Sequence, residues 1–138
     1  MNQVEIFPVH HAYAKDNGLR VFNLEAFEAL IPFDVQQRSL VSLPPGQIGG
    51  NHSHPRTEAF VAMGEELELH WTDTDAITHV ERMNPDSDFT LIVVHPHVPH
   101  AIINTATHCA ATLLEYASST QTPEDVTQRN VIDATAPR

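Results

Sequence analysis

Three side chains that commonly bind metal ions follow a pair of glycines in the stretch "GGNHSHPRTEAF", residues 49–60. His52 and His54 are two residues apart, and Glu58 has the same parity. Residues of one parity in a β-strand point to the same side, so these groups can converge, although Pro55 bends the chain between them. Two imidazoles and one carboxylate still leave a metal site one ligand short.

A second histidine-rich stretch, "HPHVPH" at residues 95–100, offers the fourth ligand. Five of the ten histidines fall into the two clusters, and His100 is followed by apolar residues and then Asn104. Because Cys109 is the only cysteine, any metal would be bound through nitrogen and oxygen. We expect Cys109 itself to be a small buried apolar residue.

The composition limits the class of protein. A chain of 138 residues fits one domain, residues 1–138, with a core at about 35–117 and a polar C-terminal extension at 118–138. We expect this extension to wrap its own core or a partner subunit, or to be partly disordered. The net charge of -11 argues against a nucleic-acid partner. Without a long apolar run or a signal-peptide pattern, we expect no membrane association and a cytoplasmic location.

Short apolar runs separated by proline and glycine predict an all-β fold with many short strands. We expect turns at 44–50, at Gly64, at 84–88 and at 95–100. One short N-terminal helix is expected at 23–30, with Asn23 as its N-cap and Pro32 beyond its end. The expected strands are 34–43, 58–63, 66–71, 88–94, 100–104 and 110–117.

These motifs resemble those of the cupins. In the first cupin motif, five residues separate a glycine from His-x-His, three or four residues separate the second histidine from a glutamate, and a further glycine follows about six residues later. The second motif ends in a histidine with an asparagine four residues on, which His100 and Asn104 match. The resemblance covers about residues 40–117 and implies a double-stranded β-helix, the cupin jelly-roll barrel. The positions that match the first motif are Gly46, His52, His54, Glu58 and Gly64.

The resemblance also implies a cofactor: one divalent metal ion bound by His52, His54, Glu58 and His100. Imidazole and carboxylate suit zinc, iron, manganese or nickel, and ligand type alone does not select among them. One position departs from the family, because His97 stands where the second motif usually has glycine. His97 either adopts a positive φ in a turn or faces the cavity as a base or spare ligand.

Three residues are candidates for a catalytic role: His97, Arg56 and Tyr116. Arg56 lies between the ligands and would meet an anionic substrate, or else it pairs with a carboxylate. Tyr116 and its neighbour Glu115 would act as general acid or base, or else they are ordinary strand residues.

The stretch around the ligands is similar to cupin domains of sugar-nucleotide and polysaccharide biosynthesis enzymes. Asn51, Thr57 and Glu58 follow that pattern, but three residues rather than four separate His54 from Glu58. We therefore expect a metal-dependent isomerase or epimerase acting on a small carbonyl or sugar-derived substrate. The alternatives are a metal-dependent dioxygenase and a non-catalytic cupin that binds a small ligand. Because small cupins usually pair through a barrel edge, we also expect a homodimer.

Overall fold

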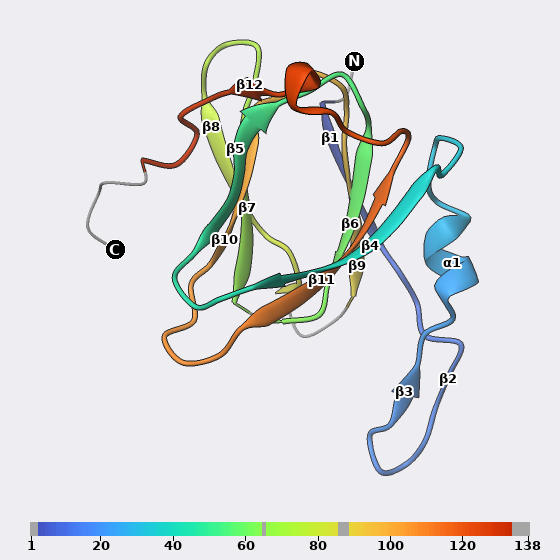
Figure 1. Ribbon diagram of the computed structural model, residues 1–138. Coiled ribbons are helices and arrows are strands. Elements are labelled where there is room, and N and C mark those ends of the chain that lie inside the picture. The colour runs from blue at the N-terminus through green and yellow to red at the C-terminus, as the bar shows by residue number, and fades with distance from the viewer. Residues whose placement is uncertain (1–2, 65, 86–88, 134–138) are drawn as a thin grey trace.

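The computed structural model describes residues 3–64, 66–85 and 89–133, which form short strands and two short helical segments (Figure 1). The elements are β1 Val4–Pro8, β2 Tyr13–Ala14, β3 Arg20–Val21, α1 Leu24–Glu28, β4 Gln37–Leu43, β5 Ile48–Ser53, β6 Glu58–Ala62, β7 Leu67–Thr72, β8 Thr78–Arg82, β9 Thr90–Val94, β10 His100–Asn104, β11 Ala111–Ala117, the 3₁₀ helix η2 Pro123–Asp125 and β12 Thr127–Gln128.

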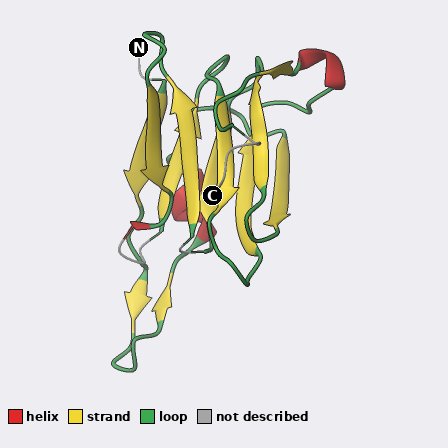
Figure 2. Cartoon of the chain, turned by 90° about the vertical axis from the view of Figure 1, so that its left-hand side faces the viewer, coloured by secondary structure: helices red, strands yellow, loops and turns green. Residues whose placement is uncertain are grey.

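Two antiparallel five-stranded sheets face each other and enclose the interior of a barrel (Figure 1). The strand order is β1-β9-β6-β11-β4 in one sheet and β12-β5-β10-β7-β8 in the other. Figure 2 shows the hairpin of β2 and β3 extending beyond the end of the barrel. The expected all-β double-stranded β-helix is therefore confirmed.

Alternating side chains of the first sheet pack on its two faces. Phe60 belongs to the cluster inside the barrel, whereas its neighbours Ala59 and Val61 belong to a second cluster outside it. Because apolar residues cover both faces, all five residues of β6 and all five of β9 are buried. In β7, Leu67 and Leu69 are fully buried in the inner cluster, as their alternation with polar residues predicts.

The short helix α1 covers the outer face of the first sheet. Phe27, its only buried residue, packs in the outer cluster with Val61 and Leu91. Asn23 has the extended backbone of an N-cap, but its side chain makes no capping hydrogen bond. The expected helix at 23–30 is thus present but shorter, and its contact with the sheet is made by Phe27.

The six expected strands correspond to β4, β6, β7, β9, β10 and β11. The sequence did not predict β1, β5, β8 or the two-residue strands β2, β3 and β12, and of these β5 carries His52. Residues 44–50 were expected to form a turn, but β5 begins at Ile48 and pairs with β10. At Gly50 the two strands approach so closely that a Cβ would lie 3.1 Å from the His100 carbonyl oxygen. Glycine here serves close packing of two strands, which sequence alone does not distinguish from a turn.

The C-terminal strap, residues 118–133, crosses the end of the barrel where β5 ends (Figure 1). β12 pairs with β5, placing Gln128 opposite His52. Beyond β12, the Asn51 side chain donates to the carbonyl of Ile132 and accepts from its backbone N–H. The extension therefore wraps its own barrel, as one of the sequence alternatives predicted; residues 134–138 lie outside the described residues.

The environment of Cys109 and the length of the helices can both be compared with the expectations from the sequence. Cys109 is exposed rather than buried, because it lies in the loop between β10 and β11. No helix in the described part of the chain is long and apolar enough to cross a membrane. The expected homodimer stays a prediction; β4 and β8 form sheet edges that a second copy would cover.

Asn104 joins the loops at the opposite end of β10 from His100. Its buried amide donates to the carbonyls of Leu43 and Cys109, both at 2.9 Å, and its side-chain oxygen accepts from the Ala106 N–H. The motif asparagine is thus structural: it fixes the ends of β4 and β11 relative to the strand that carries His100.

We predict that Asn104→Ala lowers the free energy of unfolding by about 1–3 kcal/mol, because two carbonyls lose their donor inside the protein. Urea denaturation followed by circular dichroism would measure this. Asn130→Ala, at an exposed asparagine, is the matched control. Equal losses in the two variants would contradict a structural role for Asn104.

Candidate functional site

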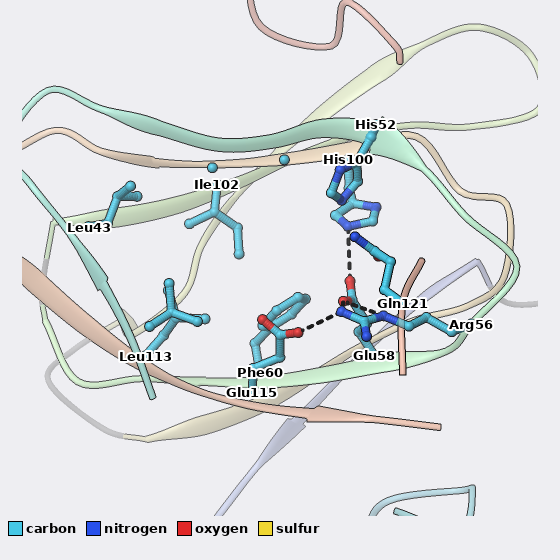
Figure 3. A pocket seen from close by; sticks show the side chains of 13 residues that line it. Leu43, His52, Arg56, Glu58, Phe60, His100, Ile102, Leu113, Glu115 and Gln121 are labelled. Carbon is cyan, nitrogen blue, oxygen red and sulfur yellow. Dashed lines mark hydrogen bonds and ion pairs between the residues drawn. The ribbon is translucent and has the colours of Figure 1, made fainter. Parts of the chain in front are cut away.

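A cavity of about 200 Å³ opens inside the barrel near the ends of β5 and β10 (Figure 3). Its inner part is apolar and is lined by Val41, Leu43, Phe60, Ile102 and Leu113. Its outer part is polar and is lined by His52, Arg56, Glu58, His100, Glu115 and Gln121. Gly49 and Gly50 complete the lining and leave the β5 backbone without side chains there.

The four residues of the cupin motifs converge at the polar end. Strand pairing places His100 directly opposite His52, while Glu58 begins β6 on the facing sheet. One candidate ligand atom from each of these residues and His54 lies within 4.8 Å of the others. His54, Glu58 and His100 are buried, and His52 is half-buried.

Hydrogen bonds to the backbone fix the orientation of two imidazoles. His54 Nδ1 lies 3.1 Å from the Arg56 carbonyl, and His100 Nδ1 lies 2.8 Å from the Val98 carbonyl. Since a carbonyl only accepts, Nδ1 carries the hydrogen in both rings. Both Nε2 atoms then face Glu58 Oε1, at 2.9 Å and 3.2 Å.

This arrangement requires positive charge between the rings and Glu58. A neutral imidazole protonated on Nδ1 presents a lone pair at Nε2, and a lone pair repels a carboxylate oxygen. Protons on the Nε2 atoms or a cation would each remove the repulsion. Three imidazoles, one carboxylate and Nδ1 atoms tied to backbone carbonyls fit a divalent metal in donor type and orientation.

The protein environment shifts the pKa of two of the four residues, His52 and Glu58. Burial, reinforced by His100 and His54, lowers the pKa of His52 to about 4, which leaves this ring neutral near pH 7. Burial alone would raise the pKa of Glu58, but hydrogen bonds with His100 and His54 outweigh it and hold this pKa well below its ordinary value. Neutral imidazole and ionised carboxylate are the forms that bind metal.

Arg56 connects Glu58 to a second carboxyl group, Glu115. Its Nε and one terminal nitrogen donate to Glu58 Oε2 at 3.0 and 2.6 Å, and the same terminal nitrogen lies 2.9 Å from Glu115 Oε1. Burial, followed by the nearby Glu58, raises the pKa of Glu115 to about 7. The Arg56 side chain is only 9% exposed, so it pairs with carboxylates inside the barrel.

The other two catalytic candidates lie away from the cavity. His97 is exposed in the turn before β10, where it has a φ of 68° and donates its backbone N–H to the His54 carbonyl. It thus takes the positive φ that the family's glycine would adopt. Tyr116 lies in the outer cluster, and its hydroxyl is 3.4 Å from Glu28; burial raises the pKa of Tyr116 to about 12.

Alternation in β11 decides which residue of the pair reaches the site. Leu113 faces the interior, so Glu115 also faces it and Tyr116 points outward. The sequence named both residues, but only the assembled sheet shows which face is internal. Gln121 of the C-terminal strap was not predicted, because nothing in its sequence neighbourhood indicates a contact with the cavity.

We predict that Glu115→Gln removes a pH-dependent destabilisation. The pKa of Glu115 is raised from 4.5 to about 7, so the folded protein binds more protons than the unfolded chain in this window. Stability from this group is therefore lost as pH rises from about 4.5 to 7. His52, with a lowered pKa, contributes the opposite slope in both proteins, so the signal is the difference between them.

Urea denaturation of metal-free protein between pH 4.5 and 8 would measure this difference. The variant should gain stability relative to the wild type up to about pH 7 and keep a constant difference above it. Tyr116→Phe, one residue away on the outer face, should show a constant difference across the range. Parallel curves for Glu115→Gln and the wild type would contradict the raised pKa.

Comparison with known proteins gives matches at the level of structure. No family model and no curated protein matches the sequence. The sugar 3,4-ketoisomerase QdtA from Thermoanaerobacterium thermosaccharolyticum, solved with TDP, has 15% identity and a TM-score of 0.71, covering 93% of this chain and 89% of that chain. The 3'-monoepimerase ChmJ from Streptomyces bikiniensis, solved with dTDP-quinovose, has 14% identity and a TM-score of 0.71, covering 91% and 69%.

A dTDP sugar isomerase from Desulfovibrio desulfuricans has 11% identity and a TM-score of 0.73, covering 95% of this chain and 85% of that chain. These matches extend over nearly the whole chain at low identity, so they compare folds rather than sites. Together with the strand order and the two motifs, they identify the architecture. The chain has the cupin fold, a double-stranded β-helix.

Proposed function

We propose that this chain is a metal-dependent enzyme that isomerises or epimerises a small carbonyl or sugar-derived substrate. One observation carries the proposal: three imidazoles and a carboxylate converge within 4.8 Å at the polar end of a cavity. Such a site holds a metal beside a space in which a small molecule would lie.

In this proposal His52, His54, Glu58 and His100 hold one divalent ion: zinc, iron, manganese or nickel. When bound, a Lewis-acid metal polarises a carbonyl group and makes an adjacent C–H bond more acidic. His54 and His100 are held for this role by their Nδ1 hydrogen bonds to backbone carbonyls.

The other polar residues of the cavity would position substrate and exclude water. Arg56 fixes the carboxyl groups of Glu58 and Glu115 in one arrangement. Glu115 lines the cavity from β11, on the sheet opposite His52, and would hold a proton beside a bound carbonyl compound. The apolar inner part of the cavity would exclude water from that proton.

The structural neighbours support the class of reaction. Their names describe a sugar 3,4-ketoisomerase, a 3'-monoepimerase and a dTDP sugar isomerase. Isomerisation and epimerisation next to a carbonyl both begin with the removal of a proton from carbon. A cavity that combines a polarising ion with a fixed carboxyl group suits that chemistry.

Elemental analysis tests the metal. We expect untagged protein purified without chelators to contain about one metal ion per chain, and the His52→Ala/His100→Ala variant to contain none, because two of four ligands are missing. His97→Ala is the matched control and should keep the ion, since His97 is exposed in a turn. Equally metal-free wild type and double variant, even after soaking in zinc or ferrous salts, would exclude the site.

Hydrogen exchange with solvent tests the reaction. We expect the metal-loaded protein to transfer deuterium from D₂O to carbon in at least one member of a panel of aldoses, ketoses and keto sugars, detected by NMR. Glu115→Gln should slow this exchange by about 10²–10⁴-fold, the usual contribution of a general acid or base. Tyr116→Phe, on the outer face, should not.

Two results would favour the alternatives. Oxygen consumption by the iron-loaded protein with diketones, thiols or catechols, without deuterium exchange, would indicate a dioxygenase. Strong thermal stabilisation by a compound that stays unchanged would indicate a binding protein.

A further inference from the structure

We propose that the substrate of this site is a single neutral polyhydroxy carbonyl compound, such as a free sugar, and not a nucleotide-linked sugar. This inference deepens the proposed function and rests on it. The described residues present few free donors for an anion to the cavity, and they present groups that suit hydroxyls and carbonyls.

Arg56, the one arginine that lines the cavity, has no donor left for an anion. Its Nε and one terminal nitrogen donate to Glu58, and that terminal nitrogen also donates to Glu115. The other terminal nitrogen donates to Gln37 Oε1 at 2.9 Å and to the Ser119 carbonyl at 3.1 Å. These five contacts use the five N–H groups of a guanidinium.

Two carboxyl groups also face this single cation. A phosphate group entering the cavity would have to displace Glu58 or Glu115 from Arg56, leaving a carboxylate without its partner inside the barrel. Within the cavity, Arg56 therefore has no free donor with which to hold a diphosphate.

The strap beside the cavity adds negative charge. Asp125 of η2 lines a small neighbouring hollow together with Arg56 and Gln121, and the chain as a whole carries -11. Arg38 of β4 pairs with Glu28 of α1, and Arg82 lies beside Glu66 and Glu68. Arg129 follows β12, where its backbone N–H donates to the Asn51 carbonyl, and we take its side chain as the candidate for holding a phosphate outside the cavity.

What the cavity does offer suits hydroxyl and carbonyl groups. The Gln121 side chain lines it and points toward the space beside His100 and Glu58 (Figure 3). No hydrogen bond of this carboxamide to another described residue is present, so its donor and acceptor are both available to a ligand. The strap holds Gln121 there, since Ser119 bonds Arg56 on one side and β12 bonds β5 on the other.

The size and the remaining surface agree with one sugar unit. The volume of about 200 Å³ lies below the roughly 300–1,000 Å³ of pockets for drug-sized ligands, and a nucleotide sugar is larger than one sugar ring. The side chains of Leu43, Ile102 and Leu113 would contact the C–H groups of a ring. Gly49 lines the cavity without a side chain and leaves room for it against the β5 backbone.

The experiment offers metal-loaded protein two sets of probes in D₂O: free aldoses and ketoses, and dTDP-linked keto sugars. We expect carbon-bound deuterium in a free sugar, and no competition by millimolar TDP. Exchange restricted to dTDP-sugars would overturn the substrate class while the proposed function stands. Exchange with neither set, in protein that contains its metal, would overturn the proposed function and this inference with it.

Two variants sharpen the result. Gln121→Ala should raise the KM for the free sugar about tenfold with little change in kcat, because one hydrogen bond to a bound ligand is lost. Asn130→Ala, an exposed residue of the same strap, is the matched control and should change neither value. Inhibition by TDP that disappears in Arg129→Ser would show a phosphate site at the rim and contradict the inference.

Discussion

The interior of this barrel depends on the compensation of one buried carboxylate, that of Glu58. A carboxylate removed from water is stable in a protein only when its oxygens are paired and hydrogen-bonded. One oxygen of Glu58 faces the imidazoles of His54 and His100, and the other accepts two hydrogen bonds from Arg56. The loop before β6 and the turn before β10 are both positioned by this requirement.

The two oxygens of Glu58 divide the site into two electrostatic halves. On the Oε1 side lie the Nε2 atoms of His54 and His100, whose rings are oriented by hydrogen bonds from Nδ1 to backbone carbonyls. This arrangement favours a cation next to Oε1. On the Oε2 side Arg56 already supplies the positive charge and shares it with Glu115. Because Arg56 donates hydrogen bonds to both carboxyl groups, its guanidinium is not available to bind an anion.

The C-terminal strap turns an open-ended barrel into a walled cavity. In residues 118–133, the Ser119 carbonyl accepts a hydrogen bond from Arg56, and β12 pairs with β5. Farther along, two hydrogen bonds from the Asn51 side chain fix the backbone of Ile132. Asn51 adopts a φ of 61°, a left-handed conformation that asparagine tolerates better than most residues. Asn51, which precedes the first candidate metal ligand, therefore serves to attach the strap, and through the strap Gln121 reaches the cavity.

The amino-acid sequence by itself determined the fold class, six of the twelve strands and the set of converging residues. His52, His54, Glu58 and His100 could be named because strand parity and the two motifs specify local spacing, and local spacing is written directly in a sequence. The strand β5 was not predicted, because Gly49 and Gly50 have the composition of a turn and form a strand only by pairing with β10.

Only the tertiary structure decided which face of each strand is internal and which distant groups meet. It placed Glu115 inside the barrel and Tyr116 outside, put His97 in an exposed turn, and used every N–H group of Arg56 within the protein. It also brought Gln121, about seventy residues from the first motif, to the cavity. Such contacts depend on sheet closure and on chain segments far apart in sequence, and no local pattern of residues contains that information.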